Sequence, residues 1–263
     1  MYPLVHYYIN KQVFGEVSHL TALGALWPDL AVAAGGDRDE AHTRGVDFFN
    51  WCRANMPEAI DAALGMISHG IDPPCVDYYA DEYWPDHIRG YMFREALPYL
   101  EQVAACTGLD GDTNIPLLPR SGEPPRSNVW WKAHNLVEMA YEIITSRLDQ
   151  LVGTQLLEAV ADTRAVAVLA QAIHSWQGLD IKSITDIFSA VPSSYALLDS
   201  DAMEQAKIQA ASMHHRFSSY NVDIPALAAL LEKISCDQEE KYPIFMDLMA
   251  GRTREQLQPY MRY

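Results

Sequence analysis

Apolar residues recur along almost the whole chain at the spacing of three and four residues that an amphipathic α-helix requires. Alternation of apolar and polar residues, which is typical of strands, is scarce. Proline and glycine mark the breaks in this pattern, as they do where helices begin and end. We therefore predict an all-α fold, a multi-helix bundle, with helices over 3–26, 37–55, 57–70, 87–107 and 129–152.

Three segments interrupt the helical pattern in the first half of the chain. They are a WPD turn at 27–29, an irregular stretch at 71–86 with three prolines, and a loop at 108–128 with four prolines. A loop of this length in a compact domain is typical of a lid or a binding segment. Residues 1–150 are expected to form a helical metal-binding core. Residues 151–263 are expected to add four or five helices packed on the same domain, with breaks near Gly178, Pro192, Pro225 and Pro243.

Charge and composition limit the classes of function. The 263 residues carry a formal charge of −16, which disfavours binding to duplex nucleic acid and to anionic lipid. The four cysteines form no CxxC pair, so we expect neither a disulfide framework nor a thiolate zinc site. We find no signal peptide and no apolar run long enough to span a membrane, so we expect a cytoplasmic protein.

Histidines and carboxylates lie on successive predicted helices, and this arrangement points to a metal site. When thiolates are absent, zinc and similar ions bind imidazole nitrogen and carboxylate oxygen, and ligands from several helices can converge in the core of a bundle. The candidates, in chain order, are His6, Asp29, His42, His69, Asp72, His134 and Glu138. For the last two, which are four residues apart on one helix, a weak surface ion pair is the alternative.

The order of five short motifs resembles that of the bacterial zinc-dependent phospholipase C family and its relatives, the single-strand-specific nucleases. The motifs are HYYIN at 6–10, GALWPD at 24–29, a histidine at 42, ALGMISHGID at 63–72 and HNLVE at 134–138. The resemblance covers about residues 1–145. It implies the same helical fold and a metal role for each of the candidates above. The family aspartate that bridges two metals follows its histidine by four residues, so Asp72, Asp77 and His87 stay open as the groups that complete the site.

The resemblance also implies a metal-dependent hydrolase that cleaves a phosphoester with a metal-activated water. Asp29 is expected to orient or deprotonate that water. One or two divalent ions are expected, zinc before manganese or iron. Arg120, Arg126 and Trp130 are candidates for contacts with a small phosphoester substrate.

Two other classes of function stay open. One is a non-catalytic helical binding or scaffold protein with a degenerate metal site. The other is an HD-like nucleotide phosphohydrolase, which the lack of an adjacent His-Asp pair disfavours. Residues 151–263 would complete the core, cover the site or form a homodimer face.

Overall fold

The computed structural model describes residues 3–82, 90–108, 129–195, 202–216 and 222–261, and every regular element within them is helical. The predicted all-α, multi-helix class is therefore confirmed. The elements in chain order are α1 (Pro3–Phe14), α2 (His19–Leu30), η1 (Ala31–Ala34), α3 (Arg38–Thr43), α4 (Gly45–Asn55), η2 (Pro57–Ala59), α5 (Ile60–His69), η3 (Tyr78–Glu82), α6 (Tyr91–Ala96), η4 (Leu97–Tyr99), α7 (Leu100–Thr107), α8 (Val129–Leu148), α9 (Leu151–Ala161), α10 (Thr163–Gln177), α11 (Ile181–Tyr195), α12 (Ala202–Arg216), α13 (Ile224–Gln238) and α14 (Tyr242–Leu257).

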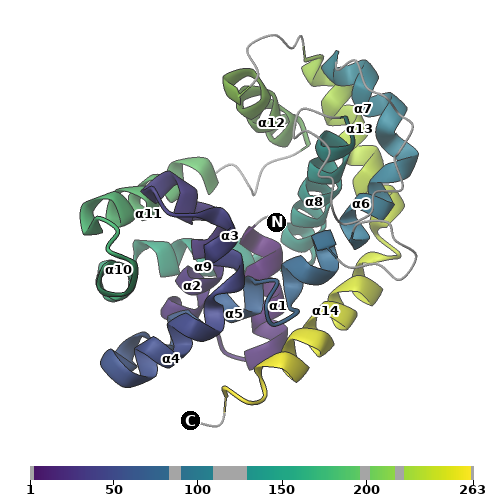
Figure 1. The fold of residues 1–263 in the computed structure, drawn as a ribbon. Helices are drawn as coiled ribbons and strands as arrows, with labels where there is room; N and C mark the ends of the chain where they lie inside the picture. Colours follow the sequence, from purple (N-terminus) through teal and green to yellow (C-terminus); the bar gives the residue numbers. More distant parts are fainter. Residues whose placement is uncertain (1–2, 83–89, 109–128, 196–201, 217–221, 262–263) are drawn as a thin grey trace.

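Helix α1 lies in the middle of the molecule, between two sets of helices (Figure 1). On one side it packs on α2, α5 and α9, and on the other it packs on α8 and α14. The helices after residue 150 return to both sides, since α9 and α10 pack on α2 while α13 packs on α8. One apolar core runs through both sets. The first half of the chain and the second thus share a core around α1.

Two glycines bring α2 and α5 into close contact. A Cβ atom added at Gly24 would lie 1.9 Å from the carbonyl oxygen of Ala62, and one at Gly65 would lie 2.1 Å from that of Thr21. Neither position therefore has room for a side chain. This close approach holds the ends of the two helices side by side, and those ends carry Asp29 and His69.

Several predicted boundaries differ from the structure. The expected helix 3–26 is two helices, because Gly15 adopts a left-handed φ of 79° and Ser18 then caps α2 by accepting a hydrogen bond from the amide of Thr21. The predicted turn at 27–29 is wrong, since these residues form the last turn of α2. Pro28 lies within this last turn, where it cannot donate one backbone hydrogen bond.

Two more differences concern helix number. The predicted helix 37–55 is divided between α3 and α4, and the described residues after 150 form six helices, α9 to α14, where four or five were expected. Gly178, Pro225 and Pro243 do mark helix ends or starts, whereas Pro192 lies inside α11. Among the described helices, none combines the length and the apolar character that a bilayer crossing demands.

Candidate metal centre

Four side chains from separate helical segments converge to form what we call the first group: Asp29, His42, His69 and Asp77. One ligand atom from each lies within 4.8 Å of every other. The two histidine Nε2 atoms are 3.3 Å apart, and the Asp77 Oδ2 atom is 3.3 Å from one and 3.2 Å from the other. Ligand atoms around a tetrahedral zinc ion are separated by about 3.3–3.6 Å, given metal–ligand bonds of about 2.0–2.2 Å. The spacing of this group therefore fits one small divalent cation.

The tautomers of the two histidines add to this fit. The Nδ1 atom of His42 lies 2.7 Å from the carbonyl oxygen of Arg38, and the Nδ1 atom of His69 lies 2.6 Å from that of Ala25. A carbonyl oxygen only accepts, so both Nδ1 atoms carry protons. In the neutral rings both Nε2 atoms then present lone pairs to each other, an arrangement that a shared cation stabilises.

In the ion-free protein, a proton substitutes for that cation. Burial lowers the pKa of His42, yet Asp29 and Asp77 outweigh burial and raise it to about 9. Burial raises the pKa of Asp29, but the surrounding positive charge, which includes His69, holds it well below its ordinary value. The first group is thus a set of ionised carboxylates around imidazoles that attract positive charge.

His6 extends the first group. Its ring stacks on that of His69, with centroids 3.9 Å apart, and its Nε2 atom lies 3.4 Å from the Oδ1 atom of Asp77. The two oxygens of Asp77 therefore face different imidazoles. Burial, followed by the charge of His69, lowers the pKa of His6 to about 4, so the ring is neutral near pH 7. A neutral, buried imidazole is the form that binds metals.

A buried carboxylate on α8 holds the helix that carries His6. Glu142 accepts hydrogen bonds from the amides of Leu4 at 3.0 Å and Val5 at 2.8 Å, in the first turn of α1. It is fully buried, and burial raises its pKa to about 8 although the two amides oppose the shift. The first turn of α1 is thereby attached to the helix that supplies the next set of ligands.

The second group contains Asp81, His134 and Glu138, whose ligand atoms also lie within 4.8 Å of one another. The Nε2 atom of His134 is 2.9 Å from Asp81 Oδ1 and 3.6 Å from Glu138 Oε1. All three side chains are buried. Burial raises the pKa of Glu138 to about 7. The i, i+4 pair on α8 is therefore no surface ion pair.

One short segment supplies a carboxylate to each group. Asp77 and Asp81 are four residues apart, and the chain between them enters the wide helical turn Tyr78–Glu82. Gly90 packs against this turn so closely that a Cβ atom there would lie 2.1 Å from the carbonyl oxygen of Ala80. Wide turns of this kind are frequent at functional sites. The two groups therefore lie next to each other, about one helical turn apart.

The first group opens to solvent at Asp29, whose side chain is 36 % exposed while its three partners are at most 1 % exposed. Arg38 begins α3 one turn before His42 and is 37 % exposed. Among the described residues its one ion pair is a long contact of 3.9 Å with exposed Asp39. Burial lowers the pKa of Arg38, but the carboxylates of both groups outweigh it and the net direction is upward. This arginine beside the opening was missed in the sequence, although its i, i+4 spacing from His42 was a usable signal.

The structure brings six of the seven predicted metal ligands together and leaves out Asp72. Helix α5 ends at His69, so helical spacing no longer applies three residues later, and Asp72 is exposed in the turn that follows. The chain then returns into the core, where Asp77, the alternative, occupies the place expected of Asp72. Asp81 was not predicted; its spacing of four from Asp77 was the available signal.

Of the three residues predicted to contact the substrate, one lies within the described residues. Trp130 is a core residue rather than a surface for substrate, since it is 3 % exposed and its indole N–H points to the Phe93 carbonyl oxygen at 3.4 Å. Its neighbour Trp131 is half-buried beside His134. The other two substrate candidates, Arg120 and Arg126, lie outside the described residues, as does His87, the remaining candidate for completing the metal site.

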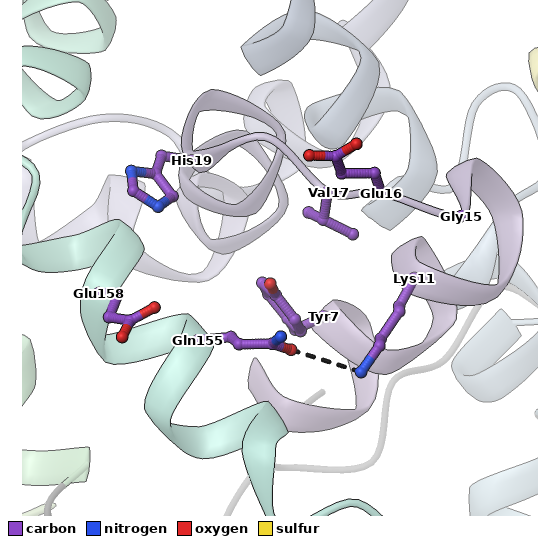
Figure 2. A pocket seen from close by; sticks show the side chains of 8 residues that line it. All are labelled: Tyr7, Lys11, Gly15, Glu16, Val17, His19, Gln155 and Glu158. Atoms are coloured by element: carbon purple, nitrogen blue, oxygen red, sulfur yellow. Dashed lines mark hydrogen bonds between the residues drawn. The ribbon is translucent and has the colours of Figure 1, made fainter.

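A pocket of about 260 Å³ lies between α1, the start of α2 and α9 (Figure 2). None of the residues that line it belongs to either ligand group. Lys11 on its wall pairs with Asp149 at 2.7 Å and contacts Gln155 at 3.4 Å, so its charge is already compensated. The pocket is therefore separate from the metal centre.

Comparisons with protein families, with characterised proteins and with solved structures find no match to this chain. The arguments about function therefore depend on the geometry of the two groups.

Proposed function

We propose that this protein is a metal-dependent hydrolase that cleaves a small phosphoester, with a metal-activated water as the nucleophile. One observation supports this above all: two imidazole Nε2 atoms, each fixed as a lone-pair donor by a carbonyl at its Nδ1 atom, lie 3.3 Å apart against a buried carboxylate. The order of the motifs along the chain, which resembles that of the zinc-dependent phospholipases C, supports the choice of reaction.

The two groups fit divalent ions by charge as well as by distance. Each contains two carboxylates and histidines that are neutral when they bind a metal, so one dication would balance each group. Ions bound there would lower the pKa of a coordinated water and polarise the phosphoryl group.

The residues of the chain have distinct parts in such a reaction. Asp29 is ionised and faces the opening, so it would orient the attacking water. Arg38 is close enough to Asp77 and Asp29 for their charges to raise its pKa, and it would donate charge-assisted hydrogen bonds to phosphate oxygens. Asp77 would stay ionised between the imidazoles, which keeps them in place.

The scaffold alternative depended on departures from the family pattern around Asp72 and His87. Asp77 offers a buried carboxylate in place of Asp72, which favours the hydrolase, while His87 lies outside the described residues. The HD-like alternative gains no specific observation from the structure.

Metal analysis tests the proposal. Protein purified without added metal or a histidine tag should contain tightly bound zinc, manganese or iron, and His69→Ala should lose the ion of the first group while the second group keeps its own. His174→Ala, which changes an exposed histidine outside both groups, is the matched control. The loaded protein should hydrolyse bis(p-nitrophenyl) phosphate or p-nitrophenyl phosphate, and His69→Ala should not. A protein that binds no divalent ion would refute the proposal, and one that binds ions but hydrolyses neither ester would refute the enzymatic part.

A further inference from the structure

The two ligand groups differ in chemistry. The first group offers two imidazoles and two carboxylates, with a third imidazole, His6, beside it. The second group offers two carboxylates and a single imidazole. Imidazole nitrogen favours zinc, copper, iron and nickel, whereas carboxylate oxygen favours magnesium, calcium and manganese.

The second group is built as firmly as the first. The Nδ1 atom of His134 lies 3.0 Å from the side-chain oxygen of Asn135, which accepts a hydrogen bond from it, so the Nε2 atom is the one that faces the carboxylates of Asp81 and Glu138. The Phe93 ring stacks on the imidazole with centroids 4.0 Å apart, and Trp131 meets it edge-on. Asp81 is 6 % exposed and Glu138 is 4 % exposed. Their negative charges are therefore held in an apolar surrounding, where a cation is strongly favoured.

We infer that the two groups bind different metals: the first group zinc, and the second group a harder cation, manganese(II), with Asp81 as the residue that sets the preference. This inference rests on the proposed function only in that both groups bind divalent ions. Three protein ligands leave open positions on an ion that prefers six, and these positions are available to water and phosphate oxygens.

The preference is relative. Zinc binds almost any nitrogen and oxygen site more tightly than manganese does. The quantity that distinguishes the groups is therefore the ratio of the zinc affinity to the manganese affinity, which we expect to be smaller at the second group by about ten-fold or more.

A single substitution isolates the cause. Asp81→His converts the second group to two imidazoles and one carboxylate without touching the first group. In the His69→Ala background, which disables the first group, zinc and manganese affinities are measured by competition with a chromophoric chelator, and bound manganese is followed by electron paramagnetic resonance. We expect Asp81→His to raise the zinc-to-manganese ratio about ten-fold. An unchanged ratio would overturn the inference.

A measurement on the unaltered protein covers the case in which a variant fails to fold. Metal-free protein is loaded with one equivalent each of zinc and manganese and crystallised, and anomalous maps are collected at both absorption edges. Zinc in the first group with manganese in the second supports the inference. Zinc in both groups overturns it and leaves the proposed function intact, whereas density for neither ion overturns both.

Discussion

Replacing Gly65 by alanine should separate the two helices that carry the first group. The new Cβ atom would lie 2.1 Å from the carbonyl oxygen of Thr21 and 2.7 Å from the amide nitrogen of Ala25. Ordinary contact begins at 3.4 Å, so α2 and α5 must move apart by more than 1 Å. Neither obstacle is the end of a flexible side chain, so no rotamer change relieves the contact.

Two effects should follow from this movement. Overpacking of a core costs about 1–3 kcal/mol, and backbone obstacles place this substitution at the upper end of that range. The movement also lengthens the hydrogen bond of 2.6 Å from His69 Nδ1 to the carbonyl oxygen of Ala25, which lies in the same contact. The first group should therefore lose metal affinity in addition to the loss of packing.

The two effects are measured separately. Urea unfolding in excess chelator reports packing alone, and equilibrium dialysis against buffered zinc reports affinity. Gly251→Ala is the matched control, because a Cβ atom at that position in α14 meets nothing within 4 Å. It should stabilise the protein by about 0.5–1 kcal/mol, as alanine in place of a helical glycine does. If Gly65→Ala unfolds at the same urea concentration as the parent and binds zinc equally well, the close approach of α2 and α5 has been described incorrectly.

Three further predictions concern the site. In excess chelator, the raised pKa of His42 stabilises the folded protein by at most roughly 3 kcal/mol. This stabilisation is fully present below pH 6.5, the pKa of His42 in the unfolded chain, and it is lost as the pH rises to about 9, its pKa in the folded protein. Urea titrations across this range should show the loss in the parent, while a His42→Gln variant that loses as much would contradict this assignment. Arg38→Ala should raise KM for a phosphodiester about ten- to a hundred-fold, the value of one or two hydrogen bonds to a charged group, with a smaller rise for Arg38→Lys; equal KM values in steady-state assays would exclude a substrate contact. Asp77→Asn should weaken zinc binding by more than about a hundred-fold in dialysis, whereas Asp72→Asn should leave it unchanged. A loss of affinity in Asp72→Asn but not in Asp77→Asn would show that Asp72, the residue predicted from the sequence, is the ligand.

The fold class and most members of the two groups could be predicted from the sequence, because both depend on local patterns. Helical spacing of apolar residues is a property of short windows, and His134 and Glu138 are paired by that spacing alone. The position of Asp29 after a small-residue run was equally visible, although the segment around it is helix rather than turn.

Asp77 and Asp81 could not be chosen by the same argument. Both follow the end of α5 and a turn with two prolines, and Asp81 lies inside the wide helical turn, so the periodicity that relates residues on one helix does not extend from α5 to them. The partner of Asp81 on α8, His134, is 53 residues away in the chain. Arg38 lies four residues before His42, but that spacing alone does not show that its charge lies near the carboxylates of both groups, which depends on how α3 packs on α2 and α5.

The acidity of the chain and an anionic substrate are compatible once the location of the charges is considered. Four of the carboxylates belong to the two groups, where one dication in each would balance them. Bound ions would therefore leave the opening at Asp29 close to neutral, and Arg38 adds a positive charge there. The rest of the surface stays acidic and would repel extended polyanions and anionic membranes. A small phosphoester, which reaches the opening without lying along the surface, is the anion that this distribution of charge favours.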